Sequence, residues 1–216
     1  MSKRFLVILA VCVLGLVGIY VATSKKADAP TSKTGSSSTS KLSNNVIGKN
    51  TKGVQLTEYG DFQCPACGAY HPIVKQVVEK YKNEIQFQFR NFPLQQLHKN
   101  ARSSARAAEA AAKQNKYWEM HDLLYEQQDA WKDSTTPNVI FEGYASQLGL
   151  NTAKFKTDFA STEVNEIINA DYAEGTRLEI NSTPTFFLQG KKITQSPRDV
   201  EGFSKLIDQA IKDAKK

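Results

Sequence analysis

Cysteine is scarce in this sequence. Only three of the 216 residues are cysteine, and one of them, Cys12, lies inside a long apolar run. The rest of the chain has only Cys64 and Cys67, which are too few and too close together to hold a disulfide-rich scaffold. The folded part must therefore depend on its own hydrophobic core.

The chain also lacks a basic domain, although its net charge is +6. Six basic residues and one acidic residue lie within positions 1–45, so the remaining 171 residues carry a net charge of only +1. A nucleic-acid-binding domain normally concentrates positive charge on one face or segment. This charge distribution argues against nucleic acid as a partner.

The longest apolar run covers residues 5–22, which are 18 residues without a charge or a proline. A helix of this length spans about 27 Å, close to the hydrocarbon thickness of a bilayer. A cleaved signal peptide is the alternative, but its apolar region is usually shorter, and Pro30 follows the only Ala-x-Ala site at 27–29. We predict a cytoplasmic tail at 1–4 and a single uncleaved transmembrane anchor at 5–22.

Residues 23–45 have almost no large apolar side chain, and eight of the ten residues at positions 31–40 are Ser or Thr. Such a segment cannot bury a core. We predict a flexible linker at 23–45 that holds a folded domain, residues 46–216, outside the cell membrane.

The folded part begins with a strand–helix–strand pattern. Residues 54–59 and 85–89 alternate between apolar and polar side chains, which is typical of half-buried strands. Between them, apolar residues recur at helical spacing from Pro65 to Tyr81, and Pro72 is expected to kink this helix. This pattern predicts a βαβ unit.

The periodicity is helical from about residue 97 to residue 178. Strand character returns at 185–188, followed by a turn and a last helix from 199 to about 214. A helical block inserted between a βαβ half and a ββα half indicates one α/β domain rather than two.

The sequence Cys-Pro-Ala-Cys at positions 64–67 lies where the first strand meets its helix. A helix N-terminus stabilises a thiolate at Cys64, and Cys67 returns beneath it one turn later. Such a pair can form and break a disulfide with little backbone movement, so the motif favours redox chemistry.

Two other interpretations of the cysteine pair stay open. A static disulfide of this span would add only about 2 kcal/mol of stability. A metal clamp would need further ligands, since no second Cys-x-x-Cys pair exists and His71, His98 and His121 stand at no spacing typical of zinc ligands. Both are weaker than the redox interpretation.

A second motif, Ser-Thr-Pro-Thr-Phe-Phe at 182–187, opens the later strand. A proline at this place often only marks a strand edge. Beside a Cys-x-x-Cys motif, a cis peptide bond between Thr183 and Pro184 would instead present the backbone of residue 183 to an extended substrate.

With these motifs the chain resembles a membrane-tethered, DsbA-like member of the thioredoxin superfamily. The resemblance covers about residues 54–214 and is carried by Glu-Tyr-Gly-Asp-Phe-Gln-Cys-Pro-Ala-Cys at 58–67, by Pro72, by the helical insertion and by the motif at 182–187. It implies a thioredoxin-like fold with a helical insertion at about 97–178.

The resemblance also implies roles for individual residues. Cys64 would be the nucleophilic, solvent-facing thiol and Cys67 the resolving thiol. Pro184 would be the cis-proline, with Thr183 before it in the substrate-binding site.

Glu58 falls where DsbA-like proteins carry a buried acid that helps to move protons near the cysteines. A solvated strand residue is the other interpretation of Glu58, because Asp61 is nearby and the sequence does not say which of the two is buried.

One position departs from the family pattern. DsbA has a histidine before the second cysteine, and this chain has Ala66. Without the imidazole, the thiolate of Cys64 should be less favoured and the disulfide less strongly oxidising.

We therefore expect a thiol–disulfide oxidoreductase that acts on the thiols of unfolded secreted proteins, without an organic cofactor or a metal. A membrane redox partner, not identified by the sequence, would recycle it. The alternatives are a tethered reductase or isomerase of the same fold, and a non-enzymatic module that binds a metal or a protein.

Overall fold

The structure, a computed structural model, describes residues 41–215. The predicted tail at 1–4, the anchor at 5–22 and nearly all of the linker at 23–45 lie outside these residues and stay predictions. Among residues 41–215, no helix has both the length and the apolar character needed to cross a bilayer.

The described strands form one sheet in the order β1-β3-β2-β4-β5. They are β1 (Val46–Ile47), β2 (Val54–Gly60), β3 (Ile85–Asn91), β4 (Thr185–Leu188) and β5 (Lys191–Lys192). Strands β2 and β3 are parallel, and the other neighbours are antiparallel. Parallel neighbours need a crossover, which is helix α2 (Pro65–Tyr81).

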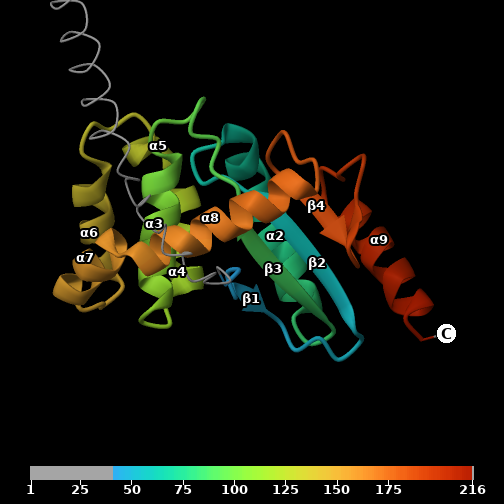
Figure 1. The fold of residues 1–216 in the computed structure, drawn as a ribbon. Helices are drawn as coiled ribbons and strands as arrows, with labels where there is room; N and C mark the ends of the chain where they lie inside the picture. Colours follow the sequence, from blue (N-terminus) through green and yellow to red (C-terminus); the bar gives the residue numbers. More distant parts are fainter. Residues whose placement is uncertain (1–40, 216) are drawn as a thin grey trace, which may run out of the picture. The chain divides into compact units, whose positions relative to one another are not determined.

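Helices cover both faces of the sheet, as Figure 1 shows. Successive side chains of β2 point to opposite faces. Glu58 faces the side of α2, where it lines a cavity together with α2 residues. Tyr59 faces α8 (Thr162–Arg177), where its hydroxyl donates a hydrogen bond to Glu174 over 2.8 Å. Helix α9 (Val200–Asp213) packs beside α2.

The predicted helical block lies between β3 and β4. It consists of α3 (Ala101–Ala112), α4 (Tyr117–Glu126), α5 (Gln128–Trp131), α6 (Pro137–Gln147), α7 (Thr152–Ala160) and α8. Ala105, Ala108 and Ala111 of α3 are buried, and their small side chains let neighbouring helices approach closely. The predicted α/β fold with a helical insertion is confirmed.

The structure differs from the sequence-based expectation in detail. Strand β1 and helix α5 were not predicted, because two and four residues are too short to show a period. Helix α2 holds Pro72 inside one continuous helix, and the expected kink at Pro72 stays a prediction.

The last residues of the predicted linker are packed on the domain. Ser43 and Asn45 are buried. The backbone N–H of Ser43 donates to Asp171 over 3.0 Å, and the Asn45 amide donates to Glu109 over 2.7 Å. These two residues therefore belong to the folded domain.

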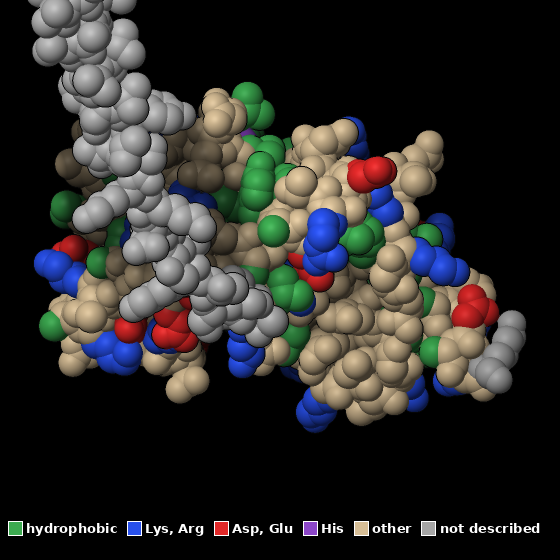
Figure 2. Space-filling model, in the orientation of Figure 1, with side chains coloured by type: hydrophobic (Ala, Val, Ile, Leu, Met, Phe, Trp, Pro, Cys, Tyr) green, Lys and Arg blue, Asp and Glu red, His purple; other side chains and the backbone are tan. Residues whose placement is uncertain are grey.

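Charged side chains on the face seen in Figure 2 are mixed in sign, with Lys and Arg scattered among Asp and Glu. No broad single-sign patch is visible on the described part of that face. This agrees with the near-neutral charge of the folded part.

Candidate active site

The two cysteines lie where β2 leads into α2. Cys64 is the N-cap of α2, and Pro65 occupies the first turn, where its missing N–H costs no hydrogen bond. The Cys64 side chain is 7% exposed, and Cys67 is completely buried one turn later. Both are free thiols. The thiol expected to face solvent is thus nearly enclosed, and it remains the more accessible of the two.

The two thiols have opposite acidities. A hydrogen bond from the Cys67 thiol, with further ones from the N–H groups of Cys67 and Ala66, lowers the pKa of Cys64 to about 5 against the effect of burial. Burial, the bond to Cys64 and the charge of Glu58 raise the pKa of Cys67. Cys64 is therefore a thiolate at neutral pH, while Cys67 keeps its proton.

The peptide bond between Thr183 and Pro184 is cis, as predicted. It brings the Thr183 carbonyl oxygen within 3.3 Å of the Cys64 sulfur. The Thr183 hydroxyl is buried and has no hydrogen-bond partner among the described residues. The motifs at 64–67 and 182–187 thus meet in one site.

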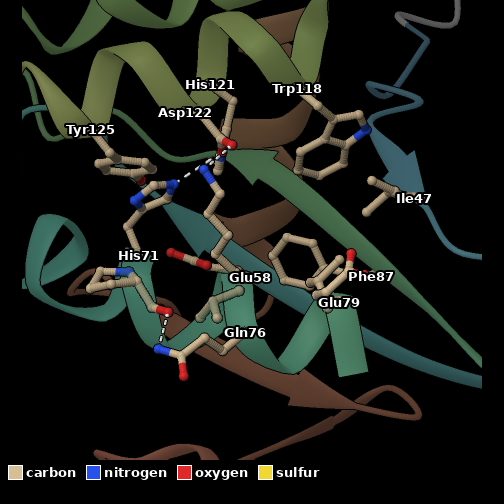
Figure 3. A pocket seen from close by; sticks show the side chains of 14 residues that line it. Ile47, Glu58, His71, Gln76, Glu79, Phe87, Trp118, His121, Asp122 and Tyr125 are labelled. Carbon is tan, nitrogen blue, oxygen red and sulfur yellow. Dashed lines mark hydrogen bonds and ion pairs between the residues drawn. The ribbon is translucent and has the colours of Figure 1, made fainter. Parts of the chain in front are cut away.

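Glu58 is buried, so its interpretation as a solvated strand residue is wrong. It lines a cavity of about 590 Å³ between α2 and α4 (Figure 3). Burial, reinforced by the nearby charge of Cys64, raises the pKa of Glu58 to about 8. The carboxyl group is therefore largely protonated at neutral pH.

Asp61 is buried as well but is fully engaged in hydrogen bonds. Its carboxylate accepts from the N–H groups of Gln63 (2.8 Å) and Leu94 (2.9 Å), and it lies 2.7 Å from Nδ1 of His98. Asp61 therefore shapes the loop before Cys64, whereas Glu58 has no hydrogen bond from a described residue and is free to exchange a proton.

The helical insertion holds the loop of the cysteine pair through residues that the sequence did not single out. The Gln128 amide donates to the carbonyl oxygens of Phe62 (2.6 Å) and Cys64 (3.1 Å). Gln63 donates to the carbonyl of Lys132 over 2.7 Å and accepts from the N–H of Asn100 over 2.6 Å. No spacing in the sequence indicates these contacts, because they join separate elements.

Comparisons with known proteins agree with this geometry. Residues 40–209 match the thioredoxin family. The chain is 33% identical over 170 residues to the Na(+)/H(+) antiporter NhaA 3 of Salinispora tropica, which covers 79% of this chain and 25% of the antiporter. The chain thus spans about a quarter of the length of such relatives. It is 28% identical over 175 residues to the probable disulfide bond formation protein D of Bacillus cereus, covering 77% and 78% of the two chains.

Solved structures give the same fold. A thioredoxin-like oxidoreductase from Silicibacter pomeroyi superposes with a TM-score of 0.64 at 26% identity and covers 77% of this chain and 91% of its own. The α-DsbA1 protein of Wolbachia pipientis superposes with a TM-score of 0.67 at 19% identity and covers 81% and 94%. The chain therefore belongs to the thioredoxin family and has the fold of its DsbA-type thiol–disulfide oxidoreductases.

Proposed function

We propose that this protein is a thiol–disulfide oxidoreductase that introduces disulfides into secreted or cell-surface proteins through Cys64 and Cys67. One observation carries the proposal. Two adjacent thiols have opposite pKa shifts, with the acidic one at a helix N-terminus beside Thr183 and Pro184. A static disulfide or a buried structural thiol pair needs no such asymmetry.

The reaction starts from the Cys64–Cys67 disulfide. A substrate thiolate attacks the Cys64 sulfur, which forms a mixed disulfide and releases Cys67 as a thiolate. The protonated carboxyl of Glu58, whose pKa is about 8, supplies the proton that Cys67 takes up. A second substrate thiolate then attacks the substrate sulfur of the mixed disulfide and releases Cys64 as a thiolate. The substrate loses two electrons, and the cysteine pair gains them.

The low pKa of Cys64 favours this direction. A stable thiolate leaves the mixed disulfide readily and stabilises the reduced form, which makes the disulfide a better oxidant. Reduction is the same exchange run backwards, so the reduction potential of the pair decides between an oxidase and a reductase. Ala66 offers no imidazole, and we keep the expectation of a weaker oxidant than a histidine-containing pair.

The setting of the enzyme is part of the proposal. The apolar run at 5–22 would anchor the chain in the cell membrane with the catalytic domain outside the cytoplasm. Unfolded secreted chains with free thiols would be the substrates, and a membrane redox protein would reoxidise the pair. The similarity to a probable disulfide bond formation protein supports this assignment.

The test combines two cysteine variants with a measurement of the reduction potential of the Cys64–Cys67 pair. Cys64→Ser should abolish the oxidation of a reduced, unfolded protein, whereas Cys67→Ala should accumulate mixed disulfides through Cys64. The reduction potential, measured against glutathione, should lie on the oxidising side of the glutathione couple. Trapping by the Cys64 variant, or trapping by both equally, contradicts the assigned roles.

A further inference from the structure

A second cluster of reactive side chains lies in the cavity that Glu58 lines. His71 comes from α2, and His121 and Asp122 come from α4, some fifty residues later in the chain. Figure 3 shows the side chains of His71, His121 and Asp122 converging beside the cavity. The spacing of the histidines in the sequence predicts no metal site, but the packing of α4 against α2 brings them together.

Two of the three separations between ligand atoms are close to those around a tetrahedral metal ion. Nε2 of His71 lies 3.0 Å from Oδ1 of Asp122, and Nδ1 of His121 lies 3.2 Å from the same oxygen. All three atoms lie within 4.8 Å of one another. Zinc bonds of about 2.0–2.2 Å in a tetrahedron place neighbouring ligand atoms about 3.3–3.6 Å apart. Shifts of a few tenths of an ångström at the carboxylate, with a closer approach of the imidazoles, would complete the geometry.

The donor atoms suit zinc. His71 and His121 each offer an imidazole nitrogen, and Asp122 offers a carboxylate oxygen. Zinc binds such mixed nitrogen and oxygen ligands, whereas calcium and magnesium bind oxygen ligands almost exclusively.

The ammonium group of Lys75 also contacts Asp122, but through Oδ2, the oxygen that does not contact the imidazoles. Its ammonium lies 2.7 Å from Oδ2 of Asp122, the oxygen turned away from the imidazoles, and 2.8 Å from Glu126. Lys75 therefore fixes the carboxylate from behind, as an outer-shell partner does in known metal sites. The acidic groups Asp122 and Glu126 together outweigh its charge.

The imidazole of His121 is held in a ring of aromatic side chains. Its neighbours are Phe62, Phe89, Tyr117, Trp118 and Tyr125. Nε2 of His121 is buried and has no hydrogen-bond partner among the described residues. The aromatic packing, together with the contact of Nδ1 with Asp122 over 3.2 Å, thus fixes the orientation of this ring.

We propose that His71, His121 and Asp122 form a binding site for one zinc ion. Water in the adjoining cavity supplies the fourth ligand, which gives the open coordination of an accessible zinc site. The site lies apart from the cysteine pair, and its existence does not depend on the thiol chemistry proposed above.

Zinc binding can be measured without interference from the thiols. The full chain carrying Cys64→Ser and Cys67→Ser, without a histidine tag and in the detergent that its apolar segment requires, is titrated with Zn²⁺ by calorimetry. Co²⁺ is used in parallel, because a tetrahedral site gives intense visible absorption bands. One equivalent of Zn²⁺ should bind, and it should displace Co²⁺.

Three further substitutions in this background locate the site. His71→Gln and Asp122→Asn should each weaken Zn²⁺ binding at least tenfold. His98→Gln removes the remaining histidine of the chain, which lies beside Asp61, and should leave Zn²⁺ affinity unchanged. Circular dichroism and thermal melting establish that each variant is folded.

Either of two results overturns the proposal. One is the absence of saturable, one-to-one Zn²⁺ binding in the double serine chain. The other is binding by a folded Asp122→Asn chain that is as tight as in its parent. Asp122 is 31% exposed, so this substitution leaves the hydrophobic core intact and provides the decision even if His71→Gln does not fold.

Discussion

Two buried carboxylates, Asp171 and Glu58, lie on opposite faces of the same sheet and are treated differently by their surroundings. Asp171 of α8 accepts hydrogen bonds from the backbone N–H groups of Ser43 and Asn91, both over 3.0 Å, and lies 3.3 Å from the guanidinium of Arg90. Glu58 faces a cavity and receives no hydrogen bond from a described residue.

Burial affects the pKa of the two carboxyl groups to different extents. Burial raises the pKa of Asp171, while its donors and the charge of Arg90 counteract that rise. Nothing comparable opposes burial at Glu58, whose pKa reaches about 8. A carboxylate surrounded by donors ties elements together, whereas a carboxyl group without donors keeps its proton near neutral pH and can pass it on.

The largest effect is expected from removing the paired carboxylate. Asp171→Ala leaves Arg90 without its buried partner and two backbone N–H groups without an acceptor, so the free energy of unfolding should fall by about 3–5 kcal/mol. Urea titration measures this loss. Asp129→Ala, at a 92% exposed position in an i,i+3 ion pair, is the control and should change little. A loss at Asp171 below about 1 kcal/mol would remove the distinction between the two carboxylates.

Glu58 should affect stability through pH instead. In the unfolded chain its carboxyl ionises near pH 4.5, and in the folded protein near pH 8. Between these values the folded form holds the extra proton, so the free energy of unfolding should decrease as pH rises through this window, by a few kcal/mol in all. Glu58→Gln should abolish that decrease.

The measurement must use the oxidised protein, in which burial alone raises the pKa of Glu58 because the Cys64 thiolate is absent, so the window ends below pH 8. In the reduced protein the lowered pKa of Cys64 has the opposite effect on stability. It makes the free energy of unfolding increase as pH rises from about 5 toward the ordinary thiol pKa of 9.0. Glu201→Gln, on the exposed surface of α9, is the matched control and should keep the pH profile of the parent. Identical profiles for the Glu58 variant and its parent would show that Glu58 ionises normally.

The reactivity of the Cys64 thiol as a function of pH tests its lowered pKa. The rate of alkylation of the reduced protein by iodoacetamide should follow a titration near pH 5, because only the thiolate reacts. Glu58→Gln should change this apparent pKa only modestly, since hydrogen bonds rather than Glu58 lower it. An apparent pKa above 8 would contradict the proposed role of Cys64.

The smallest loss of stability is expected from removing the hydrogen bond between Tyr59 and Glu174, on the face of the sheet that also holds Asp171. Tyr59→Phe keeps the ring contact with Phe187 and removes only the hydrogen bond to Glu174. The expected loss is about 1 kcal/mol of unfolding free energy. A loss as large as that of Asp171→Ala would mean that the hydroxyl, rather than the carboxylate, is the main link on this face.

The sequence predicted those features that depend on neighbouring residues. Alternation revealed β2, β3 and β4, and the Cys-Pro-Ala-Cys motif placed the thiols at the start of α2. The sequence also indicated the burial of Glu58, because alternation along β2 places Glu58 on the same face as the apolar residues Val54 and Leu56. Asp61 follows the strand, and its burial had no such signal.

Features that join distant segments were not predictable. His71 and Asp122 are some fifty residues apart, and Gln128 is more than sixty residues from the loop that it supports. No local period records such contacts, because they arise only when the helical insertion packs on the sheet.

The contact between Gln128 and the loop before α2 bears on protein engineering. Gly68 lies so close to this side chain that a Cβ there would come within 3.0 Å of the Gln128 oxygen. The loop, the glycine and the insertion therefore form a matched set. Transplanting residues 61–68 into a thioredoxin-fold scaffold without the insertion would transfer the two cysteines but leave the carbonyls of Phe62 and Cys64 without their amide donor. The environment of the two cysteines therefore depends on the helical insertion and would not be transferred with the motif alone.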